Sequence, residues 1–169
     1  MNIFVLDTDI TTCARCHCDQ HVVKMILEST QIICTALNQK GFSTPYRPTH
    51  VKHPCVIWAG TSFENLQWLK CLAIALNEEY RFRFETSADH QSLAVIKTVD
   101  GIRFESKGLT EFAQAMPEKY KVPGDPVLAY RQFYVGEKLR FARWTKRNPP
   151  QWVDELISRS PAPLHDLGD

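Results

Sequence analysis

The stretch from Cys13 to Leu37 constrains the fold more than any other part of the chain. When it is laid out at about 100° per residue, a band of roughly 80° contains His17, His21, Lys24, Glu28, Gln31 and Thr35. Apolar side chains fill most of the remaining circumference. A surface helix has the reverse pattern, a broad polar face and a narrower apolar one. We therefore expect a helix that is buried on most sides and faces a polar cavity suited to chemistry.

Two plainer interpretations of this stretch stay open. Asp19 is a good N-cap, so the helix could begin there and leave His17 in the preceding loop. The histidines could also be ordinary core residues, and Lys24 with Glu28 could be an i,i+4 pair that only stabilises the helix. In either case His21, Lys24 and Glu28 keep a common face.

Length and composition favour one domain without a global charge signal. The chain has 169 residues, of which 44% are hydrophobic, enough for one core, and we expect a domain over residues 1–152 with a loosely ordered tail over 153–169. The net charge of +1 excludes a strongly basic nucleic-acid binder and requires any polyanion site to be local. Six cysteines without a secretory signal peptide or a membrane-length apolar run indicate a cytoplasmic protein that does not associate with membranes.

The remaining pattern predicts a mostly α fold, a compact helical bundle with a short extended N-terminal segment at Ile3–Leu6. A proline-rich loop should carry His50 and His53. Helices are expected over residues 56–84, over 87–97 with Ser87 or Asp89 as the cap, and over 126–144 with Asp125 as the cap. Residues 107–126 should form a connector with one helical turn at most, because prolines interrupt it.

The last of these helices is strongly basic. Between Arg131 and Arg147 there are six basic residues and one acidic residue, a net charge of +5. Interleaved aromatic and basic side chains can bind a phosphate backbone and stack on bases, so DNA or RNA is the expected partner. The candidate residues are Arg131, Lys138, Arg140, Arg143, Trp144, Lys146 and Arg147. An ordinary amphipathic helix with a solvated basic face would show the same pattern.

Two kinds of chemistry fit the first helix. Glu28 in an apolar surround should have a raised pKa and act in acid/base catalysis without a cofactor, with His21, Lys24 and His17 beside it. Alternatively, a zinc or iron ion could be held by cysteines and histidines chosen from Cys13, Cys16, His17, His21, His50 and His53. A cysteine thiolate nucleophile is a further alternative. The chain has no GxGxxG, Walker A, HExxH or GxSxG motif.

The sequence Asp19-Gln20-His21 followed by Glu28 resembles the phage pyrimidine-dimer DNA glycosylases of the endonuclease V type. In that family a DQH opens the first long helix and a catalytic glutamate follows at the same interval. The extended start at 2–6, a histidine ahead of an apolar helix (His53) and Glu137-Lys138 before basic and aromatic residues are further similarities in the same order. The resemblance covers about a third of the chain.

This resemblance implies an all-α enzyme that cleaves the glycosidic bond of a damaged pyrimidine. The N-terminal α-amine would be the nucleophile, Glu28 would assist at the sugar, His21 would support Glu28, and residues 140–144 would grip the phosphate backbone. The chain departs from the family in its longer, cysteine-rich loop before the DQH. Asn2 also disfavours removal of Met1, so the amine would be that of Met1, if an amine is used at all.

Three functions follow in order of preference. The first is a glycosylase or AP-lyase-like enzyme acting on a nucleic-acid base through Glu28 and its neighbours. The second is a metal-dependent hydrolase or oxygenase that uses the histidines. The third is a nucleic-acid-binding module without enzymatic activity, carried by the basic C-terminal segment.

Overall fold

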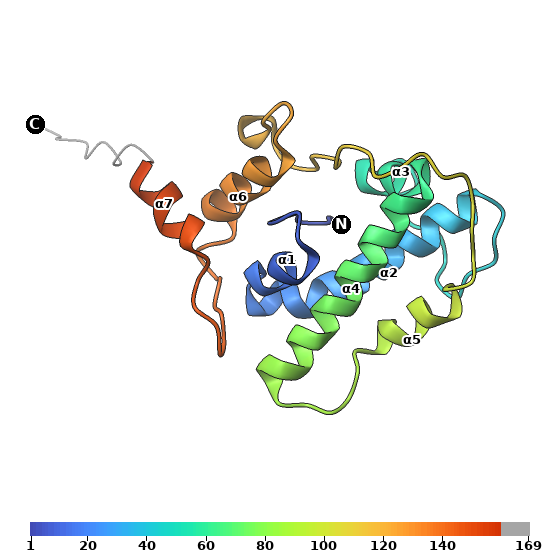
Figure 1. Ribbon diagram of the computed structural model, residues 1–169, viewed down its shortest axis with the longest axis horizontal. Helices are drawn as coiled ribbons and strands as arrows, with labels where there is room; N and C mark the ends of the chain where they lie inside the picture. Colours follow the sequence, from blue (N-terminus) through green and yellow to red (C-terminus); the bar gives the residue numbers. More distant parts are fainter. Residues whose placement is uncertain (160–169) are drawn as a thin grey trace, which may run out of the picture.

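Two long helices, α2 (Asp19–Gln39) and α4 (Phe63–Phe84), pack against each other at the centre of the structure (Figure 1). The computed structural model describes residues 1–159, and these contain helices, turns and extended segments but no strand. Helix α1 (Ile10–Cys16) packs on α4, while α3 (Pro54–Thr61) and α5 (Gln91–Thr98) pack on both long helices. The predicted mostly α fold is confirmed.

The C-terminal part forms a second, smaller group of helices. Helix α6 (Pro126–Glu137) packs against α7 (Gln151–Arg159), and the single-turn helix η1 (Glu118–Tyr120) lies beside α6. Asp125 caps α6, since its side chain accepts a hydrogen bond from Leu128 N, and Pro126 is the first helical residue, as predicted. The connector with one helical turn is also as predicted.

The N-terminal segment lies between α6 and the helices around α2 (Figure 1). Residues 2–6 are all buried, and the guanidinium of Arg131 on α6 donates to Leu6 O at 2.8 Å. Phe4 has a φ of +39°, a left-handed conformation that is strained for a bulky residue. Its ring packs against His21 and Phe133, and this burial offsets the strain. The N-terminal segment, predicted to be extended, is thus also anchored to the core.

The stretch from Cys13 is not one continuous helix, because it is broken at His17 and Cys18; this agrees with the alternative in which the long helix begins at Asp19 and leaves His17 ahead of it. Both residues are extended, and Asp19 is the first residue of α2 rather than its cap. Tertiary partners satisfy the backbone groups that the break exposes. Arg83 donates to His17 O at 2.8 Å, and the Cys18 N–H donates to the hydroxyl of Tyr134 at 2.9 Å.

Other helix boundaries also differ from the predictions. Residues 56–84 are divided by the extended Ser62, and α5 begins at Gln91 with His90, not Ser87 or Asp89, as its cap. Helix α6 ends at Glu137. The residues that follow bond to other parts of the protein; for example, Asp19 N donates a hydrogen bond to Arg143 O at 2.8 Å. The expected loose tail begins as helix α7, in which Trp152 and Val153 are buried. Residues 160–169 of that tail lie outside the described residues.

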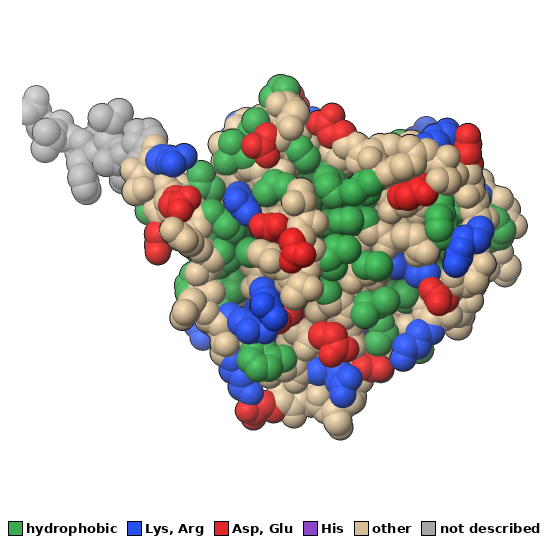
Figure 2. Space-filling model, viewed as in Figure 1, with side chains coloured by type: hydrophobic (Ala, Val, Ile, Leu, Met, Phe, Trp, Pro, Cys, Tyr) green, Lys and Arg blue, Asp and Glu red, His purple; other side chains and the backbone are tan. Residues whose placement is uncertain are grey.

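Charged side chains of both signs are interspersed on the face shown in Figure 2, as the net charge suggests. Within residues 1–159, no helix combines the length and apolar character needed to span a membrane.

Candidate active site

The Glu28 carboxylate is the centre of the candidate site. Glu28 lies on α2 and is 8% exposed. Its Oε2 accepts a hydrogen bond from Asn2 N at 2.9 Å and lies 3.7 Å from the Met1 α-amine, while the Lys24 ammonium is 3.4 Å from Oε1. The surround is therefore polar rather than apolar as expected, because the N-terminal residues fold back onto α2. Two cationic groups and one N–H face this carboxylate.

The α-amine of Met1 is held at a fixed place beside Glu28. The Met1 side chain is only 3% exposed although the residue as a whole is half-buried, so its main chain forms the exposed part. Asn2 fixes the next residue, since its side-chain amide donates to Ala115 O at 2.7 Å and its carbonyl oxygen accepts from Ile3 N. The main chain of Met1, which carries the amine, is thus both anchored and partly exposed to solvent.

His53 lies near the Met1 backbone. It caps α3, and its Nδ1 accepts a hydrogen bond from Cys55 N at 3.1 Å, so the proton of the neutral ring is on Nε2. The ring also hydrogen-bonds to the Met1 backbone. Burial lowers the pKa of His53, and the charges of the N-terminus and of His50 lower it further. His53 is therefore a neutral hydrogen-bonding group next to the amine near pH 7.

His17 and His21 do not belong to this site, which corrects the predicted polar stripe. His21 is 4% exposed and packs among Phe4, Tyr134 and Phe141, with ring centroids 4.5, 5.1 and 5.8 Å away. Burial lowers the pKa of His17 to about 4 and that of His21 to about 3. Both are neutral core imidazoles. In the described part of the chain, no hydrogen bond or ion pair joins either ring to Glu28. His21 instead supports the Glu28 site indirectly, by packing on Phe4 of the N-terminal segment.

The cysteine and histidine residues that the structure describes do not assemble a metal site. Within residues 1–159, no three His, Cys, Asp or Glu side chains lie close enough together to bind one ion. The His17 Nδ1 is bonded to Cys13 O at 2.7 Å, and His50 bonds to Thr49 in an exposed loop. All six cysteines are free thiols. Burial raises the pKa of Cys13 to about 12 and also raises that of Cys16, which disfavours a thiolate nucleophile at these positions.

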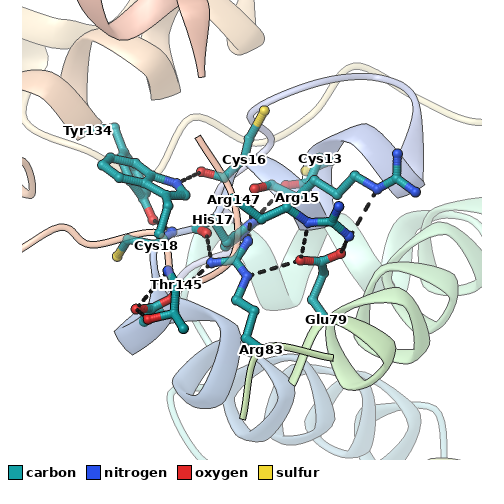
Figure 3. A network of polar contacts seen from close by, with 12 residues as sticks. Cys13, Arg15, Cys16, His17, Cys18, Glu79, Arg83, Tyr134, Thr145 and Arg147 are labelled. Atoms are coloured by element: carbon teal, nitrogen blue, oxygen red, sulfur yellow. Dashed lines mark hydrogen bonds and ion pairs between the residues drawn. The ribbon is translucent and has the colours of Figure 1, made fainter. Parts of the chain in front are cut away.

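Several basic residues predicted to bind nucleic acid hold the protein together instead. Arg147 donates to Glu79 at 2.6 Å (Figure 3). Trp144 Nε1 donates to Cys16 O at 2.9 Å, and Arg131 donates to Leu6 O and to Asp7. Lys146 pairs with Glu85. Lys138 lies 4.8 Å from the Phe133 ring centroid. Arg140 and Arg143 are exposed and stay candidates for binding phosphate.

Two cavities open along α2, one on each side of Glu28. The first, which we call the Phe84 pocket, has a volume of about 570 Å³ and is lined by Asp19, Gln20, Val23, Lys24, Phe84, Phe141 and Arg143. The second has a volume of about 350 Å³ and is lined by Leu27, Gln31 and residues 45–49 of the proline-rich loop. Lys24, Glu28 and Gln31 share one face of α2, so the carboxylate lies between the two cavities.

Sequence reasoning identified Glu28 and Lys24 but missed three features of the site. It proposed His53 only as a metal ligand or as part of a resemblance, and it assigned no role to Asn2 or Phe84. The buried apolar run that begins at residue 2 was the available signal, because it requires the chain start to be fixed against the core. Neither a protein-family model, nor a curated protein, nor a solved structure matches this chain.

Proposed function

We propose that this protein is a glycosylase and AP-lyase-like enzyme that acts on a nucleic-acid base, with the Met1 α-amine as nucleophile and Glu28 as its partner. The observation that carries the proposal is the anchored α-amine, which lies 3.7 Å from the Glu28 carboxylate on a residue whose main chain is partly exposed. In general an α-amine gives up its proton more readily than the side chain of a surface lysine does. It is therefore a suitable nucleophile for forming an imine.

The reaction can be followed at defined atoms. The amine nitrogen attacks C1′ of the target nucleotide, and the electron pair of the glycosidic bond leaves with the base, which takes up a proton. The sugar ring opens to give an imine between Met1 and C1′. Glu28 then removes a proton from C2′, and the 3′ C–O bond breaks with the phosphate as leaving group. Glu28 acts as the base, and His53 orients the Met1 main chain.

Lys24 offers a competing amine, so the test must identify which nitrogen reacts. Borohydride reduction in the presence of an oligonucleotide with an abasic site should trap a covalent adduct, and peptide mass spectrometry should locate it on Met1. Intact mass first establishes that the Met1 amine is free. Lys24→Arg should still form the adduct.

The matched control is the same protein with two extra residues ahead of Met1, which displaces the amine from Glu28. We expect this protein to fold with an unchanged circular dichroism spectrum and to lose trapping. An adduct on Lys24, or undiminished trapping by the extended protein, would exclude the amine mechanism.

A further inference from the structure

The Phe84 pocket combines exposed aromatic rings with cationic groups. Phe84, the last residue of α4, is 42% exposed, and Phe141 is half-buried in the segment after α6. Lys24 and Arg143 provide positive charge. The one acidic group that lines the pocket, Asp19, is already neutralised by Arg83 at 3.1 Å and hydrogen-bonded by Thr145. An aromatic ring carrying a phosphate fits this combination of groups.

A polar network, partly exposed, holds the segment that forms one wall of the pocket (Figure 3). Trp144 donates to Cys16 O, Thr145 bonds to Asp19 through N and Oγ1, and Arg147 bonds to Glu79. Each of these hydrogen bonds joins one of residues 144–147 to α1, α2 or α4. The Arg143 side chain forms no ion pair within residues 1–159, whereas its carbonyl oxygen is fixed by Asp19 N at 2.8 Å. The network therefore fixes the backbone at this wall of the pocket. The guanidinium of Arg143 remains able to bind a ligand.

The pocket adjoins the proposed reaction centre through Lys24. This residue lines the pocket, and its ammonium is 3.4 Å from Glu28 Oε1. Four residues of an α-helix rise about 6 Å, so the pocket lies about one nucleotide away from the site at Glu28. The volume of about 570 Å³ is large enough for one nucleotide.

We infer that the Phe84 pocket binds an unpaired nucleobase and its phosphate, from the nucleotide that flanks the reacting one. The base stacks on Phe84 or Phe141, and Arg143 and Lys24 bind the phosphate. The substrate is then a nucleic-acid strand that is single or opened at two adjacent positions. This inference rests on the proposed function for the place of the neighbouring nucleotide, but it can be tested by binding alone.

The test uses fluorescence anisotropy of a labelled single-stranded oligonucleotide with one tetrahydrofuran abasic analogue, which binds without turnover. Phe84→Ala should weaken binding about tenfold, the loss expected for one base stack. Phe82→Ala is the matched control, because Phe82 is 45% exposed on the same helix but lies outside the pocket. It should change affinity less than twofold.

Two further comparisons separate stacking from general effects on the fold. Replacing the flanking base by a second tetrahydrofuran should weaken binding by the wild type about tenfold. The same replacement should hardly affect binding by Phe84→Ala, because loss of the base and loss of the ring remove the same contact. Arg143→Ala should lower the slope of log K against log salt by about 1, whereas Arg103→Ala, an exposed arginine away from the pocket, should not.

Equal losses in Phe84→Ala and Phe82→Ala, or additive losses in the double comparison, would overturn the inference. So would a wild type that does not bind the oligonucleotide, or a Phe84→Ala variant that changes only the oligomeric state, since the pocket would then take a protein partner. Binding that follows the expected pattern without borohydride trapping would instead exclude the proposed function and leave the pocket assigned.

Discussion

Glu28 on α2 and Glu79 on α4 are almost equally buried, at 8% and 6% exposed, but have opposite surroundings. Glu79 accepts hydrogen bonds from Arg83 at 3.0 Å and from Arg147 at 2.6 Å (Figure 3). Glu28 has one N–H donor at 2.9 Å, and its two ammonium partners stand farther off at 3.4 and 3.7 Å. One carboxylate is held by guanidinium groups at hydrogen-bonding distance, whereas the ammonium groups beside the other stand farther off.

The difference separates the carboxylate that joins helices from the carboxylate that the proposed function uses. We call Glu79, Arg83 and Arg147 the Glu79 cluster. It joins α1, α2, α4 and residues 144–147, because Arg83 also binds Asp19 and the carbonyl oxygens of Arg15 and His17. Burial alone would raise the pKa of Glu79, but hydrogen bonds from Arg147 and Arg83 hold it below its ordinary value. Breaking this cluster should affect stability, whereas changing Glu28 should affect activity.

The largest expected effect is that of Glu28→Gln on activity. The amide cannot accept the C2′ proton, so the rate of strand cleavage at an abasic site should fall about a thousandfold. The thermal midpoint should stay close to that of the wild type or rise, because the substitution removes a buried charge. Glu78→Gln, with a side chain 67% exposed on α4, is the control and should retain full activity. A large loss of stability in Glu28→Gln would show that Glu28 has a structural role, and Glu28 and Glu79 would then no longer differ in function.

The converse substitution, Glu79→Gln, should lower the free energy of unfolding by about 4 kcal/mol in urea titration, because Arg83 loses its buried counter-charge. The same Glu78→Gln variant should change it by less than about 0.5 kcal/mol, since its ion pair is exposed. Unchanged stability in Glu79→Gln would show that the cluster does not hold these helices together.

Histidines show the same contrast between the interior and the site. The pKa of His17 is lowered from 6.5 to about 4 by burial, so the unfolded chain binds more protons than the folded chain between these values. Stability is therefore complete above pH 6.5 and is lost as the pH falls toward 4. His17 alone should account for about 2 kcal/mol by pH 4.5. His17→Gln should flatten the dependence of stability on pH between 6.5 and 4.5, and an unchanged slope would contradict the burial of a neutral His17.

The sequence predicted the features that depend on local pattern. The helical content, the Asp125–Pro126 start of α6 and the Lys24–Glu28 pair follow from periodicity, capping preference and i,i+4 spacing. The start of the long helix at Asp19 was one of two alternatives that the sequence left open; it could not be decided, because the partners of the break, Arg83 and Tyr134, are distant in the sequence. For the same reason the stripe of His17, His21 and Glu28 looked like one site. Only the fold shows that aromatic rings enclose the histidines and that the Met1 amine reaches the glutamate.

The smallest expected effects come from two histidines with the same local role. His53 caps α3 by accepting from Cys55 N, and His90 caps α5 by accepting from Ser92 N. Substituting either by Ala should lower the free energy of unfolding by about 1 kcal/mol, the usual cost of a lost cap. Only His53 hydrogen-bonds to the Met1 backbone, so only His53→Ala should also slow borohydride trapping, by about tenfold. Equal trapping rates in the two variants would reduce His53 to a helix cap. A slower rate in His53→Ala alone, at matched stability, would add His53 to the open site as the residue that positions the amine.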